Sequence, residues 1–148
     1  MRTPLVTVLA LLAATLTTGC GLFPGAATDT CVDWIRFESP QQQFDDATLV
    51  VVGKPIRTDG ETRIYGYRAR IHLVDVEAVL KGEPAPGPLR IASTPVTCGQ
   101  SYPDGDPLDG NNRMLIYASN QDGGWFTQTP AQGAVPFERD TPLPFRTS

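Results

Sequence analysis

The sequence predicts a small all-β domain, a barrel or a sandwich, behind a short apolar leader. Short runs of β-branched and aromatic residues recur along the chain, and clusters of Gly, Pro and Asp separate them. A single segment has helical character. Without the leader about 129 residues remain, which is enough for one domain with its own core.

The first two strands come from the most regular patterns. Residues 48–52 (TLVVV) are bounded by Gly53, Lys54 and Pro55, which is typical of a short buried strand. Residues 64–79 alternate for longer, with Arg68, Arg70 and His72 on the polar face, but from Val74 the apolar positions shift by one. Such a change of face predicts a bulge or a sharp bend, the feature that curls a small sheet into a barrel.

The remaining elements follow from turn residues. Residues 81–88 and 103–112 are rich in Gly and Pro and predict loops. Between and after them, residues 89–96, 114–118 and 125–129 predict the third, fourth and fifth strands. The five strands favour a barrel over a helical fold.

Both ends of this region contain prolines. Residues 33–44 have helical character, which Pro40 is expected to interrupt, and Trp34 is expected to plug an open barrel end. From Pro130 onward three further prolines predict an extended, loosely packed tail over residues 130–148.

The leader resembles the signal peptide of bacterial lipoproteins. Arg2 precedes the uncharged run 5–16, which is shorter than the roughly 20 residues of a spanning helix, and Gly19 stands directly before Cys20. The resemblance implies cleavage between Gly19 and Cys20 and acylation of the Cys20 thiol. Thr17 departs from the family pattern, which usually has a larger aliphatic residue there. The alternative is an ordinary secretory signal cut nearby.

Acylation would place the protein on the extracytoplasmic face of the cell membrane, since two or three acyl chains hold a domain durably in a bilayer. Residues 20–30 would then be the lipidated cysteine and a flexible tether, roughly 17–19 Å long for ten residues. Removing residues 1–19 takes away one of the 12 basic residues and no acid, which leaves 11 against 16. This acidic balance argues against nucleic acid as a partner.

A second resemblance covers residues 31–129, and short motifs carry it in this order: Cys31, residues 46–54, Leu80-Lys81-Gly82, Thr97-Cys98-Gly99, and Asp109-Gly110 before residues 114–118. The series is similar to bacterial relatives of the netrin-like domain, the fold of tissue inhibitors of metalloproteinases. The resemblance implies a five-stranded OB-type barrel that disulfides join to an amino-terminal segment.

The three cysteines fit this picture. With Cys20 acylated, Cys31 and Cys98 are the remaining pair in an oxidising compartment, and the resemblance implies the same bridge. The alternative is two unrelated free thiols. The family often carries a cysteine near residues 127–129, which this chain lacks.

The inhibitor activity itself does not follow. The resemblance implies that animal inhibitors bind the protease zinc through the free amine of their first cysteine. Cys31 follows Cys20 by eleven residues, so its nitrogen is a peptide amide without an available lone pair. Unless a second cleavage frees that nitrogen, zinc chelation by this route is excluded.

Enzymatic and metal-dependent functions find little support in the sequence, and no cofactor is expected. His72 stands alone in mid-strand and is expected to face solvent. The established catalytic and metal motifs do not occur. The loop acids Asp104, Asp106 and Asp109, with Asn111, miss the EF-hand spacing and are expected to be solvated turn residues.

Two hypotheses of function remain. The first is a lipid-anchored, non-catalytic module that binds another envelope protein. The second is an envelope binding protein that holds a sugar or another small ligand in the barrel cleft, since OB-type barrels bind oligosaccharides on one sheet face. Tyr65, Tyr67, Trp125 and Phe126 lie on predicted strands and fit such a face, although Tyr67 and one of the last two are expected in the core.

Overall fold

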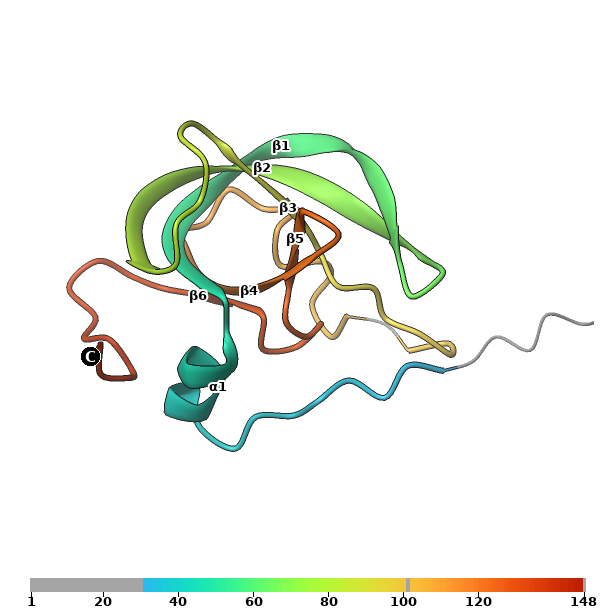
Figure 1. Cartoon of the computed structure of the whole chain (residues 1–148), viewed down its shortest axis with the longest axis horizontal. Coiled ribbons are helices and arrows are strands. Elements are labelled where there is room, and N and C mark those ends of the chain that lie inside the picture. Colours follow the sequence, from blue (N-terminus) through green and yellow to red (C-terminus); the bar gives the residue numbers. More distant parts are fainter. Residues whose placement is uncertain (1–30, 101, 148) are drawn as a thin grey trace, which may run out of the picture.

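The computed structural model describes residues 31–100 and 102–147 (Figure 1). The predicted cleavage site at Gly19, the predicted acylation site at Cys20 and the tether lie outside the described residues. The elements are, in chain order, α1 (Pro40–Asp46), β1 (Leu49–Ile64), β2 (Tyr67–Lys81), β3 (Leu89–Ala92), β4 (Met114–Gln121), β5 (Gly124–Thr127) and β6 (Ala134–Pro136).

Five of the strands form a partly closed ring. The strand order is β1-β2-β3-β5-β4, and β4 pairs back with β1 to close the circle. The pair β3–β5 is parallel, and the other strand pairs are antiparallel. This confirms the predicted all-β fold with a small five-stranded barrel of the OB type. The short strand β6 pairs with the first residues of β4, Met114 to Ile116.

The β1–β2 hairpin is longer than the sequence pattern predicts. The first strand was expected to end at Val52, yet β1 continues to Ile64 beside β2. Its pairing with β4 ends at Gly53, so Pro55 lies in the part of β1 that has β2 as its single strand neighbour. An edge position tolerates a proline because one side of the strand makes no ladder hydrogen bonds. The hairpin therefore extends as a curved arm to its turn at Tyr65–Gly66 (Figure 1).

The bulge that the sequence pattern predicts occurs in this arm, on β1. Thr58 pairs with His72 and Glu61 pairs with Arg70, so three steps along β1 match two along β2. The additional residue of β1 is a bulge, which bends the hairpin. Strand β2 itself keeps alternating from Arg70 to Val74, because Arg70 and His72 both donate to Asp106, so the change of face that the sequence pattern places at Val74 does not occur there. His72 therefore shares the inner face with Val74, and the expectation that it faces solvent is wrong.

The helix begins at the proline that was expected to end it. Ser39 is the N-cap, its hydroxyl accepts a hydrogen bond from the Gln42 N–H at 3.2 Å, and Pro40 stands in the first turn. Proline is favoured there because its missing N–H would have no helical partner. Within the described residues, no helix has the length and the hydropathy that crossing a membrane requires.

The core has an inner and an outer part. Inside the barrel, Leu49, Val51, Ile91 and Ile116 belong to one buried cluster. Outside it, the helix and the carboxyl-terminal segment cover the opposite faces of β1 and β4.

The carboxyl-terminal segment from Pro130 belongs to this outer cluster. Its Phe137 and Phe145 are buried, and Phe145 stacks on Phe44 of α1 with ring centroids 4.2 Å apart. The expectation of a loosely packed tail is therefore wrong. Prolines excluded a helix in this segment, but its phenylalanines provide apolar area that is buried on folding.

Candidate functional site

The amino-terminal segment 31–37, here called the strap, is tied to the barrel at both ends. Cys31 forms the predicted disulfide with Cys98, with the two Cα atoms 5.4 Å apart. Beside it, the Thr97 hydroxyl accepts from the Val32 N–H and donates to the Val32 carbonyl, each at 3.2 Å. At the other end, the Gln132 side chain exchanges two hydrogen bonds with the backbone of Phe37. The strap is therefore held in one position.

Between these ties the strap carries large apolar side chains. Trp34 is half-buried and packs against the cluster of Ile64, Ala69 and Ala92. Its ring also contacts Tyr65, at a centroid distance of 5.8 Å. Tyr65 at the hairpin turn and Ile35 on the strap are 61% and 56% exposed, which makes them the two most exposed large hydrophobic residues of the described chain. We call Trp34, Ile35 and Tyr65 the rim patch.

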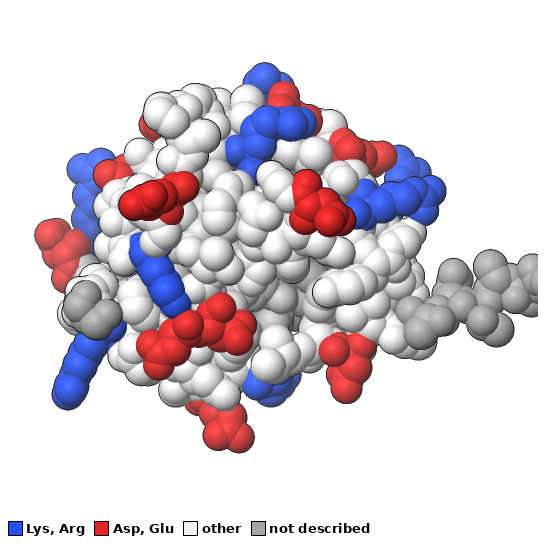
Figure 2. All heavy atoms as spheres, viewed as in Figure 1, with Lys and Arg blue, Asp and Glu red and all other residues white. Residues whose placement is uncertain are grey.

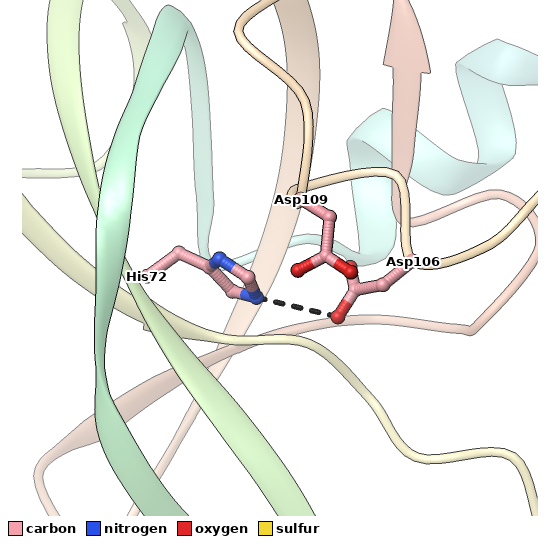
Figure 3. A group of neighbouring side chains, drawn as sticks. All are labelled: His72, Asp106 and Asp109. Atoms are coloured by element: carbon pink, nitrogen blue, oxygen red, sulfur yellow. Dashed lines mark hydrogen bonds and ion pairs between the residues drawn. The ribbon is translucent and has the colours of Figure 1, made fainter.

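A buried charge cluster lies where loop 102–113 meets the barrel, and Asp106 is its centre. The Asp106 carboxylate accepts from the Ser93 hydroxyl at 2.7 Å and from the Leu108 N–H at 2.9 Å. Arg70 and His72 of β2 each donate to Asp106 at 3.2 Å. Figure 3 shows the imidazole of His72 directed at this carboxylate, with Asp109 beside it. The expectation that Asp106 is a solvated turn residue is therefore wrong.

His72 serves this cluster as a hydrogen-bond donor. Because a carboxylate only accepts, Nε2 carries the proton toward Asp106. Nδ1 is buried without a hydrogen-bond partner, and the residue is 1% exposed. An imidazole so enclosed cannot reach a substrate, because a general base must come within hydrogen-bond distance of the proton it removes. This arrangement favours a structural role for His72.

The same cluster has the donor types of a metal site. Ligand atoms of His72, Asp106 and Asp109 lie within 4.8 Å of one another. However, the Arg70 guanidinium already donates to both carboxylates. It therefore supplies the positive charge that a cation would bring, and a metal would have to displace it.

The electrostatics of the cluster favour the ionised carboxylate. Burial alone would raise the pKa of Asp106, but the hydrogen bonds from His72, Ser93 and the Leu108 backbone outweigh it and lower that pKa below its usual value. Nearby, burial first and the Asp106 charge second raise the pKa of Tyr102. Tyr102 therefore keeps its proton and donates to the Thr94 carbonyl. Loop 102–113 is thus pinned to β2 and to the segment after β3.

The pinned loop forms one wall of an apolar cleft of about 370 Å³. Segment 130–136 forms the other wall, and Met114 lies between them. The lining consists mainly of proline, alanine, valine and methionine side chains, and it includes no His, Cys, Lys or Arg. Ligand-binding clefts in proteins begin at about 300 Å³, so this cleft has the size to hold a small ligand or a partner's side chains.

A second hollow of about 220 Å³, the aromatic cleft, lies between the β4–β5 turn and the β1 arm. Trp125 and Phe126, both half-buried, line it together with the polar side chains of Thr62, Arg63, Gln121 and Asp122. The sequence placed one of the two aromatic residues in the core; Trp125 does pack against the inner core cluster, although both rings remain partly exposed.

Sequence reasoning found only part of these sites. Asp104 and Asn111 are exposed, as expected of turn residues. The roles of Arg70, Ser93 and Tyr102 were missed. Arg70 and Ser93 stand 36 and 13 residues before Asp106 in the sequence. They reach its carboxylate only because the barrel fold brings β2, the segment after β3 and loop 102–113 together, and no local pattern indicates this.

The surface and the comparisons give no further assignment. Figure 2 shows acidic and basic side chains around the edge of one face and a mostly uncharged centre, without a continuous basic stripe on that face. This is unlike the basic stripe expected at a nucleic-acid interface. Comparison of the chain with protein-family models, with curated proteins and with solved structures finds no match.

Proposed function

We propose that this protein is a lipid-anchored extracytoplasmic lipoprotein whose barrel is a non-catalytic module that binds another envelope protein through the apolar cleft. The observation that carries this is the cleft itself, a preformed hollow whose loop wall is held by the buried charge cluster. A rigid site loses little conformational entropy on binding. The leader with Gly19 and Cys20 supports the lipid anchor, and the netrin-like resemblance supports the barrel as an extracytoplasmic module.

The chemistry of the cleft favours binding over catalysis. Its apolar lining suits a partner's aliphatic or aromatic side chain, the kind of anchor that dominates protein interfaces. Of the two carboxylates in its lining, Asp106 is paired with Arg70 and His72, and Asp104 is exposed. The cleft thus offers mainly apolar contact area, with one exposed carboxylate on its loop wall.

Filling the cleft tests this function. Ala131 is exposed and lines the cleft, so Ala131→Trp occupies the hollow without entering the core. We expect the affinity for the envelope partner to fall about tenfold, about 1.4 kcal/mol, because the partner's anchor loses its place. The partner is first identified with a photoreactive amino acid at position 131 of the anchored chain, followed by mass spectrometry of the adduct.

Ala85 provides the matched control. It is also exposed, but it lies in the loop between β2 and β3 and does not line the cleft. Ala85→Trp should leave partner binding unchanged, and a photoreactive residue at position 85 should give no adduct. Equal adducts at both positions, or equal affinity of both Trp variants, would contradict the proposal.

The aromatic cleft supports the second candidate function, binding of a sugar. Aromatic rings beside polar groups are what a carbohydrate needs, since the rings contact its apolar face and the polar groups its hydroxyls. We expect Trp125→Ala to abolish any binding of envelope oligosaccharides, measured by calorimetry, while Ala131→Trp leaves it intact. If the wild-type chain gives no heat of binding with these oligosaccharides, sugar binding is excluded as its function.

A further inference from the structure

The rim patch leaves apolar side chains in solvent at a part of the molecule that is otherwise firmly tied down. The disulfide and the Thr97 hydrogen bonds hold the strap on one side of the patch, and Gln132 holds it on the other. Tyr65 rests against the half-buried ring of Trp34. The exposure therefore belongs to the folded state and is not the fraying of a chain end.

The position of the patch relative to Cys20 limits what can cover it. Eleven residue steps separate Cys20 from Cys31, and a fully extended chain of that length spans at most about 40 Å. If Cys20 is acylated, the start of the strap stays within that distance of the bilayer in any conformation. Figure 1 shows the hairpin turn and the start of the strap on the same side of the barrel. Of the exposed large hydrophobic residues that the structure describes, Ile35 of the patch is thus the nearest along the chain to Cys20.

The side chains of the patch suit a membrane interface. Tryptophan and tyrosine are enriched there because each combines an apolar ring with a polar group. Arg36 follows Ile35 directly, and Arg63 and Arg68 flank Tyr65, while Asp33, Glu38 and Glu61 are the acids at similar distances in the sequence. Although the whole chain is acidic, these six charges balance beside the patch. Arginine can bury its aliphatic stem while its charge meets lipid headgroups.

We propose that the rim patch contacts the outer surface of the bilayer that holds the acyl anchor, with Ile35 and Tyr65 entering the headgroup region. This inference rests on the proposed lipid anchor at Cys20. The tether holds the patch near the membrane at an effective concentration of roughly millimolar order. A contact that is too weak to bind the unanchored chain to a membrane is then sufficient to hold the anchored domain against the bilayer. The contact would fix the orientation of the domain relative to the bilayer, and with it the direction in which the apolar cleft faces.

Quenching of Trp34 fluorescence by brominated lipids tests the contact. The acylated mature chain carries Trp125→Phe, which leaves Trp34 as its one tryptophan, and is reconstituted into vesicles of phosphatidylcholine and phosphatidylglycerol. We expect lower Trp34 emission in brominated than in unbrominated vesicles. Ile35→Ser with Tyr65→Ser should lose this quenching, when each variant is normalised to its own emission in unbrominated vesicles.

Ile56 and Val79 provide the matched control because they are also exposed apolar residues, at 54% and 48%, outside the patch. Ile56→Ser with Val79→Ser should keep the full quenching. Quenching that is absent from the parent chain, or equal in both double variants, would overturn the membrane contact. Loss of self-association or of protein binding in the patch variant, with quenching unchanged, would assign the patch to a second copy or to a protein partner instead.

A dye attached at Ile35→Cys gives a second measurement that does not depend on replacing Trp125. An environment-sensitive fluorophore there should shift to the blue in vesicles, whereas one at Val79→Cys should not. The anchor is tested separately by cosedimentation with the vesicles and by the mass of Cys20. A chain that cosediments but shows neither quenching nor a blue shift overturns the patch contact alone. A chain without acyl groups that does not cosediment overturns the proposed function itself.

Discussion

Replacing Asp106 by Ala is expected to lower the free energy of unfolding by about 3–5 kcal/mol, because a buried donor left without its acceptor costs about 1–3 kcal/mol and Asp106 is the acceptor for three of them. The carboxylate is the shared acceptor of Arg70, His72, Ser93 and the Leu108 N–H. Its loss leaves several buried donors without a partner at once. Urea unfolding of a Cys20→Ser chain, followed by circular dichroism, measures the change.

Asp104 is the matched control for this replacement. It lies two residues away in the same loop but is exposed. Asp104→Ala should change the stability by less than about 0.5 kcal/mol, as is usual for surface positions. Equal effects of the two replacements would contradict the central role given to Asp106.

The same carboxylate predicts a dependence of stability on pH. The pKa of Asp106 is lower in the folded protein than its usual value, so the ionised form stabilises the folded state. Its contribution is therefore complete above the unfolded pKa of about 3.9 and is lost as the pH falls through the folded pKa. Asp106→Asn should lose less stability than the parent chain on acidification below about pH 4.

Removing the disulfide is the second large effect that we expect. Cys31 and Cys98 are 67 residues apart, and closing a loop of that length stabilises the folded state by roughly 4 kcal/mol in the chain-entropy model. Cys31→Ser with Cys98→Ser should lower the unfolding midpoint in urea accordingly. It should also release the strap, which would shift the emission of Trp34 to the red.

The parent chain under reducing conditions serves as the control, since it lacks the bridge but keeps both cysteines. Its unfolding midpoint should agree with that of the double Ser variant. A loss below about 1 kcal/mol in both cases would mean that the hydrogen bonds at Thr97 and Gln132 hold the strap without covalent help.

The local patterns predicted the elements that depend on neighbours in sequence. The apolar run at 114–118 lies within β4, the run at 48–52 enters β1 at Leu49, and the turn residues that follow Lys81 separate β2 from β3. Element ends were less predictable. Pro55 and Gly53 suggested the end of a strand, but β1 passes them because a strand without a second neighbour needs fewer ladder hydrogen bonds.

The candidate sites depended on tertiary structure to a greater extent. The spacing of Asp104, Asp106 and Asp109 excluded an EF-hand but could not tell which carboxylate is buried. His72 alternates with two arginines, so its pattern indicated the polar face. The fold instead turns this face inward, so that Arg70 and His72 both donate to Asp106 and His72 is buried on the same face as Val74. The resemblance to known families did lead to the pairing of Cys31 with Cys98.

By itself the sequence determined the all-β class and the main strands, because alternation and turn residues act locally. The pairing of Cys31 with Cys98 followed from the resemblance and from setting Cys20 aside as the acylated cysteine. Only the tertiary structure decided which polar groups are buried together, where the apolar cleft lies and which aromatic side chains remain exposed. These features depend on contacts between residues far apart in the chain. A shift of one residue in strand register moves a side chain from one face to the other, and local sequence does not record that shift.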